Sequence, residues 1–442
     1  MRPANLRGIY PGAPTLPSPA SGGAPGRPPA KAGVPGVGRG FDPEILKREF
    51  PIFANNPDLV FLDSAASAQK PRSVIDGTAD YYRTDYANVH RGVYRLSARS
   101  TELYEEARDK VRRFLNAADR REIVFVRNTT EAINLVAQSW GPAFLREGDE
   151  VLISELEHHS NIVPWQLLRD RVGIRLVVTP IDATGGLDLA AFESRLSPRT
   201  RLVAMTHVAN ATGTVVPVDR VVELAHRHRT KVLIDGSQAA PRLPVDVQAL
   251  GCDFYAFTGH KVYGPTGIGV LYGPFDLLSA MPPYQGGGEM ILHVSFEKTE
   301  YQEPPHRFEA GTPDIAGAIG LGLALDFIEG LGRENILEHE EALTGYGVDR
   351  LSQISGLRLL GAGQRRLGIL SFDVEGVHPH DVSQVLDQHQ VAVRAGHHCA
   401  QPLMERLGLA GTTRASLGVY NDEADIDRLA EALEAVQEMF TR

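Results

Sequence analysis

The sequence predicts an α/β protein with a mostly parallel sheet in its larger part and a smaller α+β domain at its C-terminal end. Between Ile123 and Gly273, short β-branched, apolar runs alternate with segments of helical spacing, a pattern typical of parallel strands covered on both faces. The composition is 43% hydrophobic and 23% charged, which agrees with a globular protein. No run approaches the roughly eighteen apolar residues of a membrane helix, so we expect no membrane span.

The expected strands of the larger part are, in order, 123–126 (IVFV), 151–154 (VLIS), 201–208 (RLVAMTHV), 231–235 (KVLID), 253–258 (DFYAFT) and 268–273 (IGVLYG). The helical segments NTTEAINLVAQSW and VDRVVELAHRHR follow the first and third strands. Further on, the strands LGILSFDV and VAVRAG flank a helix, HDVSQVLDQHQ, and the amphipathic DIDRLAEALEAVQEMF ends the chain as a helix. Sheets of this kind bind ligands at the carboxyl ends of their strands, so the candidate site lies there.

Changes in composition divide the chain into four regions. Residues 1–40 hold nine Pro and nine Gly and are expected to be a disordered tail. This tail has five basic residues and no acid, so a targeting peptide is an alternative, although apolar and amphipathic signals are missing. The segment 41–62 begins with Asp42 as a helix N-cap and is expected to pack with the small domain. A large domain (63–314) and a small domain (315–442) complete the chain.

Charge and cysteine content limit the classes of function. Outside the tail the chain carries 40 basic and 55 acidic residues, so we expect no non-specific binding of nucleic acid or of an anionic membrane surface. Two cysteines, Cys252 and Cys399, are too few for a disulfide framework. This indicates a reducing, cytoplasmic setting.

Polar residues at the strand ends are suited to cofactor chemistry. Thr130 lies in NTTE at a predicted helix start, where hydroxyl and N–H groups either bind a phosphate or simply cap the helix. His158 in EHHSN offers a ring; a surface loop or a metal site is the alternative, although no HExxH spacing is present. Asp235 ends an apolar strand, where burial requires a cationic partner unless the side chain caps the next helix.

Lys261 follows the strand 253–258 in TGHKVYGPTGIG, a loop made tight by glycines. Such a lysine is either an ordinary surface charge or an amine nucleophile whose pKa is lowered by apolar walls and other cations. Together the strand ends offer a phosphate cup, an acid for a ring nitrogen, a stacking histidine and an amine. These are the parts of a pyridoxal phosphate (PLP) site.

Six motifs carry a family resemblance. In chain order they are NVHRGVYRLS, EHHSNIVPWQ, TGHKVYGPTGIGVLYG, FEAGTPD, RAGHHCAQPLM and RASLGVYN. Their combination is similar to class II (SufS-type) cysteine desulfurases, which are PLP-dependent enzymes of aminotransferase fold type I in the class V aminotransferase group. The resemblance begins at about Phe41 and extends to the C-terminus. It implies the fold type I architecture, with a mostly parallel seven-stranded sheet in the large domain.

The resemblance implies a role for each matched cofactor residue. Lys261 would be the Schiff-base lysine. Asp235 would face the pyridinium nitrogen, and Gln238 the ring hydroxyl. His158 would stack on the ring and move protons, and Asn210 would line the same pocket, next to both cofactor and substrate.

Phosphate and substrate contacts are implied in the same way. The expected phosphate ligands within one chain are Thr130, Thr258 (often Ser in the family) and His260. Thr312 in FEAGTPD would reach the phosphate of the other subunit, since family members are homodimers with shared sites. Arg414 would bind the substrate carboxylate as a bidentate fork. Arg394 and His90 would border the pocket.

Cys399 would be the nucleophile that attacks the substrate sulfur and then carries a persulfide. Its reactive form is the thiolate, which protonated rings of His397 and His398 or the guanidinium of Arg394 would favour. From the residues alone, a metal site and a buried structural thiol are alternatives, although adjacent His-His-Cys does not match zinc spacings. The loop around Cys399 is short, so the resemblance implies that a separate SufE-like or SufU-like acceptor protein docks to collect the sulfur.

The expected function is a cysteine desulfurase that converts L-cysteine to L-alanine and supplies sulfur for iron–sulfur cluster assembly. The alternatives are a selenocysteine lyase acting on L-selenocysteine, another PLP-dependent lyase, or a catalytically inactive binding scaffold. Cys399 disfavours enzymes without a sulfur-transfer step, but selenocysteine cleavage does not strictly need it. The intact Lys261 and Asp235 disfavour a scaffold.

Overall fold

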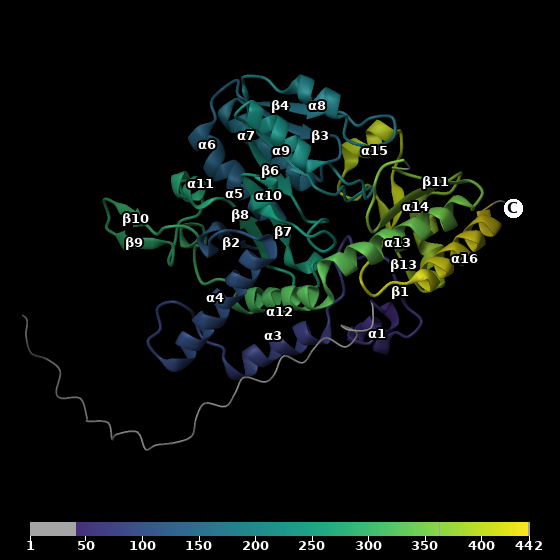
Figure 1. Ribbon diagram of the computed structural model, residues 1–442, viewed down its shortest axis with the longest axis horizontal. Coiled ribbons are helices and arrows are strands. Elements are labelled where there is room, and N and C mark those ends of the chain that lie inside the picture. The colour runs from purple at the N-terminus through teal and green to yellow at the C-terminus, as the bar shows by residue number, and fades with distance from the viewer. Residues whose placement is uncertain (1–40, 362, 441–442) are drawn as a thin grey trace, which may run out of the picture. The chain divides into compact units, whose positions relative to one another are not determined.

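The computed structural model describes residues 41–361 and 363–440 (Figure 1). The predicted tail, 1–40, lies outside the described residues. Two sheets organise the described part of the chain, one of seven strands and one of four, and two pairs of short strands accompany them. The larger sheet positions the candidate site.

The larger sheet has the strand order β2-β8-β7-β6-β5-β3-β4. Its strands are β2 (Ile123–Val126), β3 (Glu150–Ser154), β4 (Arg175–Thr179), β5 (Thr200–Thr206), β6 (Lys231–Asp235), β7 (Phe254–Thr258) and β8 (Gly269–Tyr272). Neighbours from β7 to β4 are parallel, whereas β8 runs antiparallel to both β7 and β2. The predicted mostly parallel, seven-stranded sheet is therefore confirmed. We did not predict β4, an edge strand with one buried residue, because partly exposed edge strands lack a continuous apolar core run.

Both faces of this sheet are buried. Along β3, Leu152 packs into one hydrophobic cluster while Val151 and Ile153 pack into another, as the alternation of side chains in a strand requires. The first cluster includes residues of α4 (Arg95–Leu115), α8 (Leu189–Arg195), α9 (Val218–Arg227), α10 (Val247–Leu250) and α12 (Ile315–Leu331). The second includes residues of α5 (Thr129–Leu135), α7 (Val163–Val172) and α11 (Phe275–Ala280). The short helix α6 (Gly141–Phe144) comes between α5 and α7 in the sequence. Figure 1 shows α3 (Arg72–Thr84) beside α4 and α12.

The C-terminal part contains the antiparallel sheet β11-β12-β15-β14. Its strands are β11 (Leu357–Leu359), β12 (Ile369–Val374), β14 (Arg394–Gly396) and β15 (Thr412–Ser416). The helices that accompany it are α13 (Arg333–Ser352), α14 (Pro379–Gln388), α15 (Gln401–Leu407) and α16 (Glu423–Phe440). A hydrophobic cluster of its own fills the space between this sheet and α13, α14 and α16, as an α+β arrangement requires.

The N-terminal segment runs along this C-terminal part. It contains α1 (Pro43–Lys47), α2 (Pro51–Asn55) and β1 (Val60–Phe61), and β1 pairs in parallel with β13 (Val391–Ala392). Asp42 accepts hydrogen bonds from the backbone N–H groups of Glu44 and Ile45, so it is the N-cap that we predicted. Lys47 Nζ lies 2.8 Å from Asp425 Oδ1 at the start of α16. The exact domain boundaries stay a prediction.

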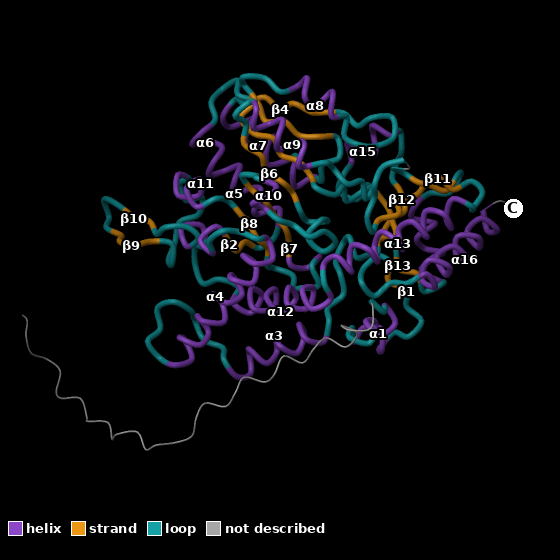
Figure 2. The backbone as a smooth tube through the Cα atoms, viewed as in Figure 1, coloured by secondary structure: helices purple, strands orange, loops and turns teal. Residues whose placement is uncertain are grey.

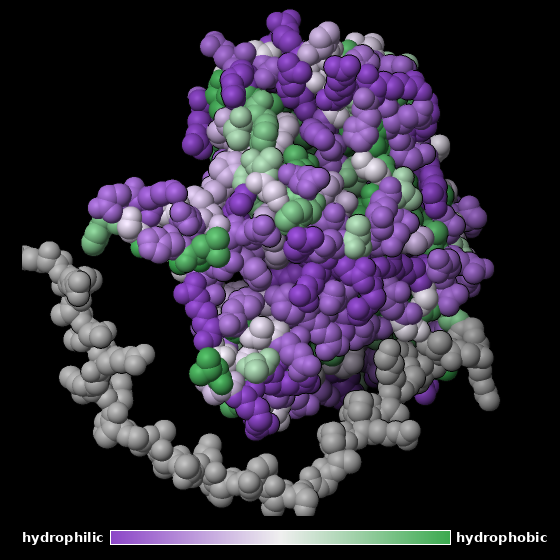
Figure 3. All heavy atoms as spheres, turned by 60° about the vertical axis from the view of Figure 1, so that its left-hand side comes forward, coloured by the Kyte–Doolittle hydropathy of each residue, from purple (hydrophilic) through white to green (hydrophobic). Residues whose placement is uncertain are grey.

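A hairpin of β9 (Ile291–Val294) and β10 (Thr299–Tyr301) stands clear of the other strands (Figure 2). Apolar side chains are exposed on it, above all Phe296. Elsewhere, hydrophilic residues dominate the face shown in Figure 3, with small apolar patches between them. Within the described ranges, no single helix is long and apolar enough to span a membrane; only α12 and α13 taken together, bent by 75°, meet the length and composition of a span.

Candidate active site

A cavity of about 390 Å³ opens where β5, β6 and β7 end, at Thr206, Asp235 and Thr258. The structure brings all of the predicted site residues to this cavity except His90 and Thr312. Those that line it are Thr130, His158, Asn210, Asp235, Gln238, Thr258, His260, Lys261, Arg394, Cys399 and Arg414. The carboxyl edge of the sheet is therefore where the candidate site lies, as its topology predicts.

Lys261 ends a short 3-10 turn, Gly259–Lys261, directly after β7. Burial is the main cause that lowers its pKa to about 8; Asp235 opposes this shift, and the cations Arg414 and Arg242 add to it. The amine is thus far more often uncharged at neutral pH than an exposed lysine, as a nucleophile requires. Asp235 itself is 5% exposed and accepts a hydrogen bond of 2.9 Å from the backbone N–H of Ser237.

Two histidines of the cavity are held neutral. Burial, followed by the charge of Lys261, lowers the pKa of His158 to about 4. His158 Nδ1 accepts the backbone N–H of Ser160 at 3.0 Å, so the proton of the neutral ring belongs on Nε2. Burial and the charges of Lys261 and Lys70 likewise lower the pKa of His260 to about 4.

Unpaired polar atoms show that the cavity suits a polar ligand. The hydroxyl of Thr258 and Oδ1 of Asn210 are buried and have no hydrogen-bond partner among the described residues. Buried polar groups are rarely left without a partner, so these atoms fit a ligand that supplies one. An amine, a carboxylate and free hydroxyls around one cavity match the groups that PLP offers, and the residues present fit this cofactor.

Two arginines that line the cavity contact the same carboxylate, that of Asp63. Arg414, 2% exposed, donates from Nη1 to the carbonyl of Asn210 at 2.8 Å, and its Nη2 lies 3.5 Å from Asp63 Oδ1. Arg394 Nη2 lies 2.8 Å from Asp63 Oδ2. Burial lowers the pKa of Arg414 to about 10, which leaves the guanidinium charged at neutral pH. Sequence reasoning missed Asp63; its only signal is an acid directly after the apolar run LVFL.

Cys399 is exposed in the loop between β14 and α15. His398 and Cys399 both adopt left-handed backbone conformations, with φ of 53° and 54°. Asn210 Nδ2 donates to the carbonyl of His398 at 2.5 Å, and the backbone N–H of His159 donates to the carbonyl of Cys399 at 2.7 Å. The loop is therefore held in place from both sides, next to the cavity.

The structure corrects one part of the thiolate hypothesis. The His398 ring is buried, and its Nε2 lies 2.9 Å from Thr412 Oγ1. Burial lowers the pKa of His398 to about 3, so this ring is uncharged at neutral pH and supplies no cation to Cys399. The expectation for His398 was wrong because its side chain turns into the protein, which the sequence HHC does not reveal. Arg394 remains a cation that interacts with Cys399.

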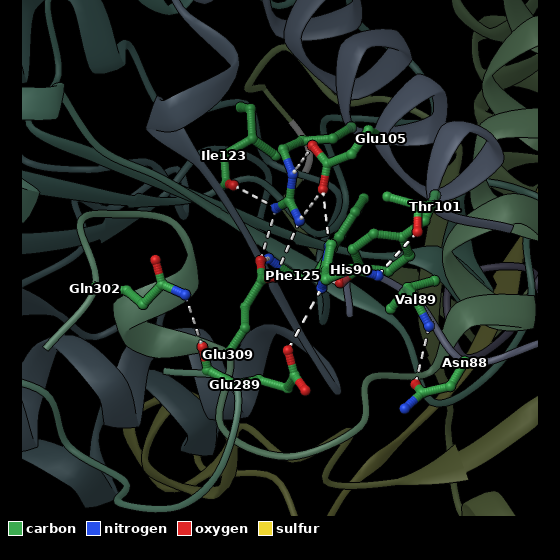
Figure 4. A network of polar contacts seen from close by, with 12 residues as sticks. Asn88, Val89, His90, Thr101, Glu105, Ile123, Phe125, Glu289, Gln302 and Glu309 are labelled. Atoms are coloured by element: carbon green, nitrogen blue, oxygen red, sulfur yellow. Dashed lines mark hydrogen bonds and ion pairs between the residues drawn. The ribbon is translucent and has the colours of Figure 1, made fainter. Parts of the chain in front are cut away.

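His90 lies outside the cavity, in the network of Figure 4. Three possible metal ligands lie close together here: a ring nitrogen of His90, a ring nitrogen of His306 and a carboxylate oxygen of Glu105. These three atoms lie within 4.8 Å of one another. However, Arg108 approaches both carboxylate oxygens of Glu105, at 3.2 and 3.3 Å, and pairs with Glu309 at 2.7 Å. A guanidinium already occupies the place of a cation here, so the cluster is best explained as an ion-pair network.

Thr312 is the other predicted residue that the cavity does not include. It lines a separate hollow of about 280 Å³, together with Glu131 and Tyr284. Several cavity residues were in turn missed by sequence reasoning. Ser237 is the clearest case, because its Oγ donates to Thr129 Oγ1 at 2.8 Å and so joins the turn after β6 to the start of α5. Its position in DGSQ, between Asp235 and Gln238, was the available signal.

The sequence pattern of the family described as aminotransferase class-V matches residues 60–429. The chain belongs to this family. It is 52% identical over 401 residues to the cysteine desulfurase of Synechococcus elongatus. The aligned region covers 90% of this chain but only 64% of the length of that relative. The family that we predicted is therefore confirmed, and the class II subtype stays a prediction.

Solved structures of similar proteins share the fold. The cysteine desulfurase CsdA (S-sulfonic acid) from Escherichia coli is 40% identical with a TM-score of 0.83, over 90% of this chain and 99% of its own. C-DES is 26% identical with a TM-score of 0.77, over 88% of this chain and 98% of its own, in a mutant with glycine covalently linked to its PLP cofactor. The predicted α/β fold of PLP-dependent enzymes is thus confirmed.

Proposed function

We propose that this chain is a PLP-dependent cysteine desulfurase, which converts L-cysteine to L-alanine and keeps the sulfur as a persulfide on Cys399. One observation carries the proposal: a desolvated amine, Lys261, a buried carboxylate, Asp235, and an exposed thiol, Cys399, line the same cavity. The relatives named cysteine desulfurase support it.

Lys261, Asp235, Gln238, His158, Asn210, Thr130, Thr258 and His260 would hold PLP. Bound PLP supplies a ring that takes up the electron pair released at Cα of an amino acid. Lys261, uncharged more often than an exposed lysine because its pKa is about 8, is suited to attach the cofactor and then to carry a proton at Nζ. Asp235 can hold a proton on the ring nitrogen, because its burial makes a cationic partner favourable. His158 presents a neutral ring whose Nε2–H can donate a hydrogen bond to a group of the ligand.

The sulfur step takes place at Cys399. The thiolate of Cys399 attacks the sulfur of the substrate, an S–S bond forms, and the C–S bond of cysteine breaks. Cβ gains a proton and alanine leaves, so cysteine and one thiol give alanine and one persulfide without any added oxidant. Because the cysteine loop is held by Asn210 and His159, we expect the persulfide to stay at the mouth of the cavity.

Arg414 is the proposed binding group for the substrate carboxylate, with Arg394 beside it. In the structure both guanidinium groups contact Asp63. A substrate carboxylate would compete with this internal acid for the same donors, and the guanidinium would keep a partner before and after binding. This exchange avoids leaving a buried cation unpaired.

The proposal extends to partners and setting. A homodimer would give Thr312 a role in the other subunit's site, since Thr312 lies outside the cavity of its own chain. An acceptor protein of SufE-like or SufU-like type would collect sulfur at the exposed Cys399 for iron–sulfur cluster assembly. We place this activity in the cytoplasm, in line with two cysteines that stay free.

The test is a single turnover followed by mass spectrometry. Purified protein with PLP is mixed with L-cysteine without reductant, alanine is quantified, and added sulfur is located by peptide. We expect one extra sulfur on the Cys399 peptide and one alanine per site. Cys399→Ser should keep PLP and lose both products, whereas Cys252→Ser should keep both. Alanine without sulfur on Cys399 would instead favour a lyase, and activity confined to L-selenocysteine would favour a selenocysteine lyase.

A further inference from the structure

The Gln238 amide is held on both sides. Gln238 lies in the turn after β6, is 2% exposed and lines the cavity. Its Nε2 donates to the carbonyl of Ala65 at 2.8 Å, and its Oε1 accepts from Arg242 Nη1 at 3.0 Å. A side-chain amide has two N–H donors, so one donor of Nε2 is available to a ligand of the cavity.

Arg242 is buried and connects several elements. Its Nη1 also donates to the carbonyl of Gln238 at 3.0 Å, and its Nη2 donates to the carbonyl of Leu417, just after β15, at 3.2 Å. Its Nε lies 2.9 Å from Glu340 Oε2 on α13. Arg242 and Glu340 are 3% and 1% exposed; burial raises the pKa of Glu340 to about 7, and the guanidinium of Arg242 opposes this rise.

The backbone next to this ion pair leaves no room for a side chain. Gly368, just before β12, has a φ of +59°. A Cβ at this position would lie 2.2 Å from Glu340 Oε2 and 2.4 Å from Arg242 Nε. Gly368 is therefore required both by its backbone conformation and by its approach to the pair. The pair is closely enclosed, which limits the positions that the guanidinium can adopt.

We propose that Arg242, held by Glu340, is a positioning residue that fixes which end of the Gln238 amide faces the cofactor. A guanidinium has only donors, so it accepts the amide oxygen on its side and excludes the amide nitrogen. The amide nitrogen is then the end that a bound ring would meet. Without Arg242, only the hydrogen bond from Nε2 to the carbonyl of Ala65 would oppose a turn of the amide, and a turned amide would present an acceptor to the ring. The inference rests on the proposed function, because Gln238 acts here on bound PLP.

The readout is the pH midpoint of the visible absorbance change of bound PLP in the full-length holoenzyme. An N–H donor stabilises the proton-poor form of the chromophore, so its loss should move the midpoint to higher pH. We expect Arg242→Met and Gln238→Met each to raise the midpoint by about half to one pH unit. Arg366→Met is the matched control: Arg366 is also buried but donates to the carbonyl of Leu360, away from Gln238, and should leave the midpoint unchanged.

A double-mutant cycle separates positioning from a direct effect of charge. If Arg242 acts through Gln238, adding Arg242→Met to Gln238→Met should not move the midpoint further. Additive shifts, or an unchanged midpoint in Arg242→Met, would overturn the inference. If Arg242→Met does not fold, Glu340→Gln takes its place. A rise of the midpoint in Glu340→Gln that does not occur when Gln238→Met is also present supports the positioning role. An unchanged midpoint in Glu340→Gln overturns it.

The same experiment distinguishes this inference from the proposed function. Wild-type protein that binds no PLP would contradict both. Wild-type protein that binds PLP and forms alanine, with a midpoint insensitive to Arg242→Met, would contradict only the positioning role. Circular dichroism and thermal unfolding of each variant exclude a general loss of structure as the cause of a shift.

Discussion

At the scale of single residues, burial separates the two cysteines. Cys252 is 2% exposed beside β7, and burial raises its pKa to about 12, so its thiolate is scarce at neutral pH. Cys399 is exposed and lines the cavity with Lys261. Because the thiolate is the reactive form, two thiols of one chain should differ widely in reactivity.

Brief alkylation of the native protein tests this difference. Iodoacetamide at neutral pH should label Cys399 and leave Cys252 unlabelled until the protein is unfolded, because Cys399 is exposed, whereas Cys252 is buried and its pKa is raised. Peptide mass spectrometry over a time course measures both sites. The Cys399→Ser variant controls for off-site labelling. Equal rates at the two cysteines in folded protein would be incompatible with the burial described.

Two lysines give the cofactor-free protein a pH-dependent stability. Burial lowers the pKa of Lys70 and of Lys261 from 10.5 to about 8. Between about pH 8 and 10.5 the unfolded chain thus binds more protons than the folded chain, so the free energy of unfolding should rise with pH. Below about pH 8 both states are protonated and this slope should vanish. Lys70→Met or Lys261→Met should each reduce the rise, as measured by urea unfolding at pH 8 and pH 10.

Circular dichroism of each variant at both pH values controls for a general loss of structure. A slope that is insensitive to both Lys70→Met and Lys261→Met would show that neither amine is desolvated in the folded protein.

Some residues of the site could be predicted from the sequence and others could not. Asp235 and Lys261 were found because the first ends one parallel strand and the second lies just after the next, and topology then brings them together. His398 was assigned wrongly and Asp63 was missed, because the direction of a side chain depends on contacts with distant segments, here Thr412 and Arg394. Local sequence does not contain those contacts.

At the scale of elements, the cysteine loop is held by hydrogen bonds from a segment distant in sequence. The ring of His159 accepts the backbone N–H of Gln401 at 3.0 Å, at the start of α15, and the backbone N–H of His159 donates to the carbonyl of Cys399 at 2.7 Å. Two successive left-handed residues, His398 and Cys399, cost free energy that these contacts offset. The loop conformation is thus set by a residue far away in sequence.

His159→Ala should loosen this loop without removing PLP. Loss of the contact with Gln401 should cost about 1 kcal/mol locally and raise amide hydrogen exchange in 399–403 about fivefold. Hydrogen exchange with mass spectrometry measures this, and the visible absorbance reports the cofactor. His378→Ala is the matched control, since His378 caps α14. Unchanged exchange in 399–403 would refute the role of His159.

The elements themselves were predicted where their patterns were strong. The central strands β5, β6 and β7 are mostly apolar, buried runs, and the structure confirms them within a few residues. The run VAVRAG was taken as one strand but divides into β13 and β14, which pair with different partners. Sequence periodicity reports burial, whereas the choice of partner is decided by the tertiary fold.

At the scale of the whole molecule, one aromatic residue joins distant segments. Phe50, fully buried, lies between α1 and α2 near the N-terminus. Its ring contacts Phe53, Tyr263, Phe327 and Tyr420, with centroid distances from 4.8 to 6.4 Å. These partners come from α2, the loop after Lys261, α12 and the segment before α16. Phe50 therefore joins the N-terminal segment to both the larger and the smaller part of the chain through one buried aromatic cluster.

Phe50→Ala should lower the free energy of unfolding by about 3–5 kcal/mol, because it removes a buried ring and leaves a cavity. Chemical denaturation followed by circular dichroism measures the change. Phe144→Ala provides the comparison: Phe144 is 43% exposed and stacks on Trp140, so its loss should cost much less. Similar costs for the two variants would contradict the central place of Phe50.

The antiparallel strand β8 has a consequence for biosynthesis. β2 lies at one edge of the sheet, where its neighbour is β8, and Ile123 pairs with Tyr272. When β2 leaves the ribosome, its partner has not yet been translated, so Thr130 at the start of α5 has no completed sheet to hold it. By the time β8 emerges, Lys261 has already been made. Capture of the cofactor by a nascent chain should therefore begin only after Tyr272 has cleared the exit tunnel.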